Sequence, residues 1–189
     1  MRPARPPSGA FISVIVGVHG RDGARDALAL GRTLASHGTS IAAAHVFFID
    51  SAAPLWTSRE EQAPQWERAL ARLRTALGVG PEAEMLGVSA TSIGEGLHDL
   101  AVEQEADLIV VGACERGGLK RLAIGDDTRS VLIQAPVPVA VAPAGYARHP
   151  GPVRVIGVVG DGHPESDQPW PSPSASPLRL VPTSPASVR

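Results

Sequence analysis

Apolar and polar residues alternate along this chain in blocks that predict strands and helices in turn. Phe11 to Val18 (FISVIVGV) is almost continuously apolar and rich in β-branched residues, which is typical of a strand buried on both faces. From Asp22 to His37 the apolar residues recur at helical spacing, and Gly38 is placed to end that helix. A second strand is predicted over Ser40 to Ile49, followed by a polar loop over Asp50 to Ala63.

The middle of the chain continues this alternation. Pro64 to Leu77 is amphipathic and predicts a second helix, and Ala83 to Ser89 predicts a third strand. Ser92 is the expected N-cap of a third helix that runs to Glu105, and Glu95 completes a capping box. The remaining predicted elements are a strand, a short helix and a strand: Asp107 to Gly112, Thr128 to Gln134 and Val137 to Ala142.

Regular alternation of strand and helix predicts an α/β fold, an open five-stranded parallel sheet that is doubly wound with helices on both faces. Pro138 removes a backbone donor at the start of the last strand, which places that strand at an edge of the sheet. Ligands of such sheets bind beyond the carboxyl ends of the strands. The residues expected there are Val18 to Gly20, His45 to Phe47 and Gly112 to Cys114.

The chain of 189 residues has room for one ordinary domain and some extra sequence. VRVIGVVGDG, from Val153, repeats the pattern of ISVIVGVHGRDG, from Ile12, and predicts a second copy that breaks off after one strand. The Pro/Ser-rich remainder is predicted to be disordered. The predicted organisation is a flexible N-terminus (1–10), a domain (11–143), a linker (144–152), the start of a second copy (153–162) and a disordered tail (163–189).

Composition argues against several classes of partner. A net charge of -2 and an aromatic content of 4% give no basis for binding nucleic acid. No apolar run approaches the length of a membrane-spanning helix, and the basic N-terminus has no apolar signal segment. The single cysteine, Cys114, fits a reducing compartment. We therefore expect a cytoplasmic protein without a nucleic acid or membrane partner.

Three glycines follow the first predicted strand at a spacing of three: Gly17, Gly20 and Gly23. Without the close Gly-x-Gly start, this spacing does not predict a dinucleotide-binding loop.

The segment VVGACERGGLKRLAIGDD, around the end of the fourth predicted strand, resembles the nucleotide-binding motif of the universal stress protein family. In nucleotide-binding members an apolar strand leads into a glycine, two residues, a glycine, nine residues and then Gly-Ser or Gly-Thr. Gly112 and Gly125 stand at the first and third glycines, whereas Glu115 replaces the second and Asp126 replaces the Ser or Thr. The resemblance covers roughly Phe11 to Pro143 and implies one domain with the fold of that family.

The resemblance also implies an adenine-nucleotide site. ATP-binding members have an Asp just after the first strand, and His19 stands at that place here. Val18 and Val46 are the expected contacts of the base, and the glycine-rich loop is the expected contact of the phosphates. The candidate cofactor-binding residues are Val18, His19, Val46, Gly112, Arg116, Gly117, Gly125, Asp126 and Thr128.

Acidic residues in this loop argue against tight binding of a polyphosphate. Glu115 puts a carboxylate where close backbone approach requires glycine, and Asp126 replaces a hydroxyl donor with an acceptor. A like-charge contact at ~4 Å costs on the order of 1–4 kcal/mol. Arg116 and Lys120 offer compensation, and a Mg²⁺ ion held by Asp126 and Asp127 would reverse the sign. The simpler interpretation is that one of the two aspartates caps the following helix.

Three hypotheses follow. The first is a non-catalytic stress-response protein of this family with weakened or absent nucleotide binding, which, as the resemblance implies, dimerises through the edge strand Val137 to Ala142. The second is an adenine-nucleotide-binding protein that holds ATP, with or without Mg²⁺, and hydrolyses it slowly. The third is a metal or redox sensor built on His19, His45 and Cys114, whose spacing carries no metal-ligand signature. No catalytic and no metal-ligating residue is predicted.

Overall fold

The computed structural model describes residues 11–19, 21–48, 59–81, 83–113, 125–153, 155–156 and 179–180. The chain divides into two units, which we consider separately: Phe11–Pro150, and residues 1–10 together with 151–189. In the second unit β6 (Val155–Ile156) and β7 (Arg179–Leu180) form a two-stranded parallel sheet. Most of the predicted second copy and of the predicted disordered tail lies outside the described residues, so these two assignments stay predictions.

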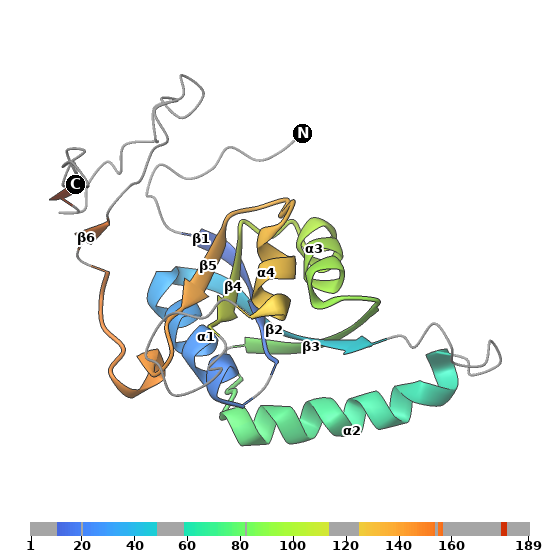
Figure 1. Cartoon of the computed structure of the whole chain (residues 1–189). Coiled ribbons are helices and arrows are strands. Elements are labelled where there is room, and N and C mark those ends of the chain that lie inside the picture. Colours follow the sequence, from blue (N-terminus) through green and yellow to red (C-terminus); the bar gives the residue numbers. More distant parts are fainter. Residues whose placement is uncertain are drawn as a thin grey trace. The chain divides into compact units, whose positions relative to one another are not determined.

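The first unit contains a five-stranded parallel sheet with the order β3-β2-β1-β4-β5 (Figure 1). Its strands are β1 (Phe11–Gly17), β2 (Ala35–Phe48), β3 (Ala83–Ala90), β4 (Leu108–Gly112) and β5 (Val139–Ala142). Its helices are α1 (Arg21–Leu34), α2 (Arg59–Leu77), α3 (Ile93–Glu103), α4 (Asp126–Leu132) and the short 3-10 helix η1 (Tyr146–Arg148). The predicted doubly wound α/β fold is confirmed, and β5 occupies an edge as Pro138 indicates.

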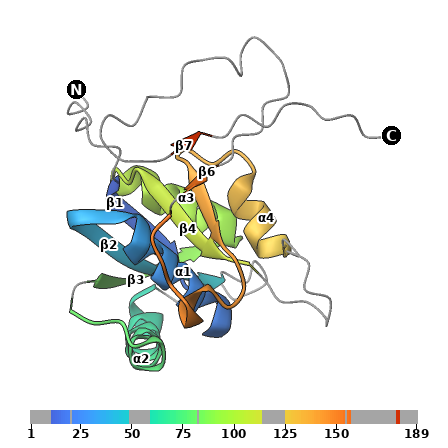
Figure 2. The ribbon, with the colours of Figure 1, turned by 90° about the vertical axis from the view of Figure 1, so that its left-hand side faces the viewer.

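Each face of the sheet carries its own apolar core, because successive strand residues point to opposite faces. On one face Val14 and Val16 pack with Leu28 of α1. On the other face Ile15 packs with Leu97 of α3, in a cluster that also includes Val131 of α4. Helix α2 runs beyond the β3 edge of the sheet (Figure 1 and Figure 2). Burial on both faces explains why β1 is almost continuously apolar.

Several predicted boundaries are wrong. Helix α1 ends at Leu34, and Gly38, with φ of +82°, lies in the first part of β2, near the register shift with β1. The predicted loop over Asp50 to Ala63 is too long, because α2 already begins at Arg59 and Pro64 lies within the helix. Pro64 is the sixth residue of α2, so it removes one hydrogen bond within the helix and its ring crowds the carbonyl of residue 60.

The predicted N-cap of α3 is present, but the Glu95 side chain bonds to Thr91, one residue before the N-cap, and not to Ser92 as in the usual capping box. The hydroxyl of Ser92 accepts a hydrogen bond from the backbone N–H of Glu95 at 3.1 Å. The Glu95 carboxylate in turn accepts from the hydroxyl and, at 3.0 Å, from the backbone N–H of Thr91. These bonds, above all the one from the Thr91 hydroxyl, hold the pKa of Glu95 below its ordinary value.

Candidate ligand-binding site

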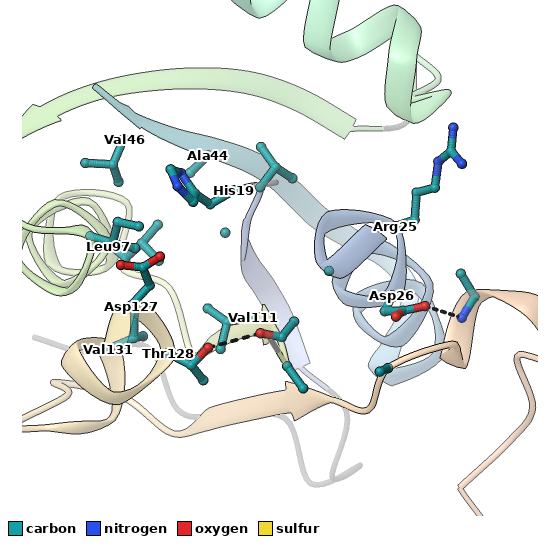
Figure 3. A pocket seen from close by; sticks show the side chains of 18 of the residues that line it. His19, Arg25, Asp26, Ala44, Val46, Leu97, Val111, Asp127, Thr128 and Val131 are labelled. Atoms are coloured by element: carbon teal, nitrogen blue, oxygen red, sulfur yellow. Dashed lines mark hydrogen bonds between the residues drawn. The ribbon is translucent and has the colours of Figure 1, made fainter. Parts of the chain in front are cut away.

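A cavity of about 590 Å³ lies at the carboxyl ends of β1 and β4, where the strand order reverses (Figure 3). Parallel sheets bind their ligands at this position, and the volume suits a small molecule. The apolar lining comes from β2, from β4, from the residue directly after β1, and from the helices α3 and α4: Val18, Ala44, Val46, Ile93, Leu97, Val111 and Val131. The cavity therefore offers a largely apolar floor to a ligand.

The backbone of α1 crosses the end of β4 at one wall of the cavity. A Cβ atom on Gly112 would lie 2.2 Å from the carbonyl oxygen of Gly23, so no larger residue fits at this position. Both glycines line the cavity. The first glycine of the predicted phosphate motif is thus required for the packing of α1 on the sheet. Gly23 was visible in the sequence as the last of three spaced glycines, but its spacing alone does not reveal this contact.

Thr128, a predicted site residue, lines the cavity and is 5% exposed. Its hydroxyl donates a hydrogen bond to the carbonyl oxygen of Gly112 at 3.1 Å (Figure 3). A hydroxyl has one proton and two lone pairs, so Thr128 offers a ligand only an acceptor in this arrangement. Thr128 is therefore a structural link between α4 and β4 as well as a cavity residue.

Helix α4 is also fastened to α3. The backbone N–H of Gly94 donates to the Ser130 hydroxyl at 3.1 Å, and Nε2 of His98 donates to the carbonyl oxygen of Val131 at 2.8 Å. A Cβ atom on Gly94 would lie 2.5 Å from the carbonyl oxygen of Ser130, so the two helices meet through their backbones. These contacts fix the direction in which the side chains of α4 point.

The two aspartates at the start of α4 differ in where they point. Gly125 is the N-cap and has no side chain, so the prediction that Asp126 or Asp127 caps this helix is wrong. Both occupy the first turn, where a carboxylate interacts favourably with the helix dipole. Both side chains are exposed, but only Asp127 lines the cavity. Figure 3 shows the Asp127 carboxylate directed from α4 toward Leu97.

The two histidines predicted to be neighbours do lie together. The rings of His19 and His45 are stacked, with their centroids 5.9 Å apart and an interplanar angle of 10°. Nδ1 of His45 donates to the carbonyl oxygen of Val18 at 2.9 Å. Phe48 and Phe47 contact the two imidazoles edge-on, so an aromatic row follows the end of β2 beside the cavity. His19 itself lines the cavity.

Among the described residues, no third metal ligand lies beside these two histidines. Cys114, the third member of the predicted sensor, lies outside them. Within the ranges that the structure describes, no group of three His, Cys, Asp or Glu side chains could hold a metal ion.

The segment that follows β5 lines another side of the cavity. Asp26 of α1, 5% exposed, accepts hydrogen bonds from the backbone N–H groups of Gly145 and Ala147, each at 2.7 Å (Figure 3). Gly145 has φ of +82°, and the Tyr146 hydroxyl donates to Thr33 at 3.1 Å. Residues that the sequence predicts as a linker are thus tied to α1 and line the cavity. Sequence patterns missed Asp26, because its partners lie far along the chain.

The structure brings together five of the nine candidate cofactor-binding residues at the cavity: Val18, His19, Val46, Gly112 and Thr128. Gly125 and Asp126 are described and do not line it. Arg116 and Gly117, like Glu115 and Lys120, lie outside the described residues. The sequence interpretation missed the roles of Asp26, Asp127 and Leu97 in this cavity, although Leu97 was readable as a buried helix residue.

Comparison with known proteins gives a consistent result over the first unit. The model of the universal stress protein family matches residues 11–143. Universal stress proteins of Mycobacterium bovis and of two strains of Mycobacterium tuberculosis are each 32% identical over 98 residues. This match covers 52% of this chain and only 33% of the length of each curated relative.

Solved structures show the same fold. The universal stress protein from Archaeoglobus fulgidus matches with a TM-score of 0.51 and 21% identity, over 70% of this chain and 98% of that chain. Universal stress protein UspA from Lactobacillus plantarum matches with a TM-score of 0.51 and 23% identity, over the same shares of the two chains, 70% and 98%. Among the described helices, none combines the length and the apolar character needed to cross a membrane.

Proposed function

Because this chain belongs to the universal stress protein family, we propose that it is a non-catalytic stress-response protein that holds a small ligand in the cavity between β1 and β4 and binds polyphosphate nucleotides weakly. The observation that carries the proposal is the hydrogen bond from Thr128 to the carbonyl oxygen of Gly112. It engages the hydroxyl proton that a phosphate oxygen would need.

Charge at the start of α4 supports the same conclusion. Asp127 lines the cavity, and a phosphate group ~4 Å from its carboxylate would be penalised by on the order of 1–4 kcal/mol. The sequence alone pointed to Asp126 as the obstacle, but Asp127 is the residue of the pair that lines the cavity. Asp127 and Thr128 together oppose a phosphate at the α4 end of the cavity, whereas Arg25 and Arg148 line the cavity elsewhere.

The chemistry of the lining supports a non-catalytic role. The hydroxyl of Thr128 is bonded to a carbonyl oxygen, which cannot act as a general base. The oxygens of Asp26 each accept a backbone N–H, so this carboxylate serves the fold. We therefore propose no nucleophilic role for Thr128 and no acid–base role for Asp26.

The second candidate is an adenine-nucleotide-binding protein, with slow hydrolysis of ATP. The size of the cavity and its apolar floor, which includes the expected base contacts Val18 and Val46, favour it. A Mg²⁺ ion that bridges Asp127 and a phosphate would offset the repulsion. This candidate differs from the first in predicted affinity and in its need for the ion.

Titration calorimetry of the full chain with ATP, with and without Mg²⁺, separates the two candidates. We expect dissociation constants of about 1 mM or weaker in both conditions, because Thr128 and Asp127 oppose the phosphates. Affinity in the micromolar range with Mg²⁺ alone would favour the second candidate. Affinity in that range without Mg²⁺ would overturn the proposal of weak binding outright.

Assembly and location complete the proposal. The edge strand β5 and the preceding residues from Val137 carry half-buried valines, and Ile133 beside them is 55% exposed. An apolar edge strand favours pairing with a second copy, so we propose a homodimer contact at Val137 to Ala142. We also propose a cytoplasmic location, because the single cysteine fits a reducing compartment. Sedimentation velocity checks the dimer; a monomer at high concentration would contradict it.

A further inference from the structure

A second cavity, of about 420 Å³, lies along α1 and is lined on its other sides by the end of α2 and the segment around η1. Helix α2 and η1 each pack against α1, and this cavity, which we call the α1 groove, lies where the three meet. Of its described lining residues, only Arg25 and Ala147 also line the first cavity, at the ends of β1 and β4. The apolar lining of the α1 groove is Leu28, Ala29, Leu77, Ala147 and Pro150.

Two arginines give the α1 groove a positive charge. Arg25 and Arg32 are seven residues apart on α1, nearly two helical turns, so they share one face of the helix at about 10 Å along its axis. None of the described lining residues is an Asp or a Glu. Leu28 and Leu77, on the floor, are 2% and 8% exposed. The groove therefore combines a fixed apolar floor with cations that attract an anion.

Hydrogen bonds hold the polar groups of the α1 groove in place. Nη2 of Arg25 donates to the carbonyl oxygen of Ala76, in the last turn of α2, at 3.0 Å, and Figure 3 shows this side chain extending away from α1. A guanidinium has five N–H donors, so others remain for a ligand. The Thr33 hydroxyl donates to the carbonyl oxygen of Ala29 at 2.9 Å and accepts from Tyr146 at 3.1 Å. The arginines are thus the donors that the groove offers to a ligand.

We propose that the α1 groove binds a small amphipathic anion, whose carboxylate meets the arginines and whose apolar body lies on the floor of Leu28 and Leu77. Guanidinium and carboxylate groups form short, charge-assisted hydrogen bonds. The volume of the groove falls within the range of small-molecule sites. This site lies on the outer side of α1 and goes beyond the proposed function, because it requires no ligand in the first cavity.

Two fluorescent probes test the chemical class of the ligand. Anilinonaphthalene sulfonate and N-phenyl-1-naphthylamine share an aromatic body, but only the first carries an anionic group. Titration of the full chain with each probe gives both affinities. We expect octanoate to displace the bound sulfonate and octylamine not to displace it, because the two arginines repel a cation. Displacement by octylamine as readily as by octanoate would overturn the selection for an anion.

Two arginine variants separate the two cavities. Arg32→Gln and Arg148→Gln each remove one positive charge from an exposed side chain, but Arg32 lines only the α1 groove and Arg148 lines only the first cavity. We expect Arg32→Gln to weaken the affinity for the sulfonate about fivefold and to leave that for the naphthylamine within about twofold. Arg148→Gln should leave both affinities within about twofold.

A third variant tests the apolar floor without changing the charge. Ala29 is half-buried in the α1 groove, so Ala29→Leu places a larger side chain in the space that the body of the ligand would occupy. We expect the affinity for the sulfonate to fall at least about fivefold. Thermal unfolding checks that each of the three variants is folded. An unchanged affinity in a folded Ala29→Leu variant would overturn the proposed position of the ligand.

The remaining outcomes are equally decisive. A larger effect of Arg148→Gln than of Arg32→Gln would place the anion in the first cavity and overturn the inference. Equal effects of the two would mean that net charge alone attracts the probe, which also overturns it. The absence of saturable binding of the sulfonate would exclude the site. None of these results bears on the titration with ATP, which tests the proposed function separately.

Discussion

Two aspartates line the same cavity and differ in exposure and in hydrogen bonding. Asp26, on α1, is 5% exposed, and its two oxygens accept backbone N–H groups at 2.7 Å. Asp127, on α4, is exposed and reaches the cavity from the start of its helix. The comparison teaches that a carboxylate in a cavity serves the ligand only when the backbone has not already taken its acceptor capacity. Removing each charge should therefore have different effects on stability and on binding.

The largest expected effect is on Asp26. In Asp26→Asn an amide NH2 group replaces one acceptor and faces a backbone N–H, and we expect the free energy of unfolding to fall by about 3 kcal/mol. Chemical denaturation measures this loss. Asp127→Asn is the matched control and should change the free energy of unfolding by less than about 0.5 kcal/mol. Equal losses in the two variants would remove the distinction drawn between them.

Thr128→Val extends the comparison to a hydroxyl. The variant keeps the side-chain shape and removes the bond to the carbonyl of Gly112, so the free energy of unfolding should fall by about 1–2 kcal/mol. The affinity for ATP should stay within about twofold, because the proton is already engaged. Thr128→Ser keeps the hydroxyl and serves as the control. A large loss of ATP affinity in the valine variant would show that the hydroxyl donates to phosphate.

The smallest expected effect concerns Glu95, a surface carboxylate that accepts hydrogen bonds from the hydroxyl and the backbone N–H of Thr91. Hydrogen bonds from Thr91 lower its pKa, so the ionised carboxylate contributes stability above its ordinary pKa of 4.5. That contribution is lost as the pH falls through the lowered pKa. Glu95→Gln should be less stable than the parent chain at neutral pH, and the gap should close on acidification. Urea denaturation at several pH values tests this; a gap that does not vary with pH would contradict it.

Local patterns predicted the sheet well, because they report burial directly. The run from Phe11 to Val18 is apolar on both faces, and β1 is the central strand of the observed order. Pro138 marked the edge strand, since a missing donor is costly elsewhere in a sheet. The start of α2 was not predictable in this way, because residues from Arg59 to Ala63 are mostly polar and helical propensity alone is a weak signal.

The chemistry of the cavity depended on orientation, which a sequence does not contain. Val18 and Val46 could be placed at strand ends, and the structure has them in the cavity. Which aspartate of α4 points inward follows from how His98 and Ser130 fix that helix against α3. The position of α4 also explains why the Thr128 hydroxyl donates its proton to the carbonyl oxygen of Gly112. Long-range geometry of this kind decides whether a polar residue is available to a ligand.

The bond between Asp26 and Gly145 spans 119 residues of sequence, and it has a consequence for biosynthesis. During synthesis α1 emerges long before the segment that satisfies its buried carboxylate. The family match ends at residue 143, before either backbone N–H that Asp26 accepts from. A nascent chain that folded before Gly145 and Ala147 had emerged would bury this carboxylate without its backbone donors, so we expect such shorter intermediates to be less stable and easier for proteases to open.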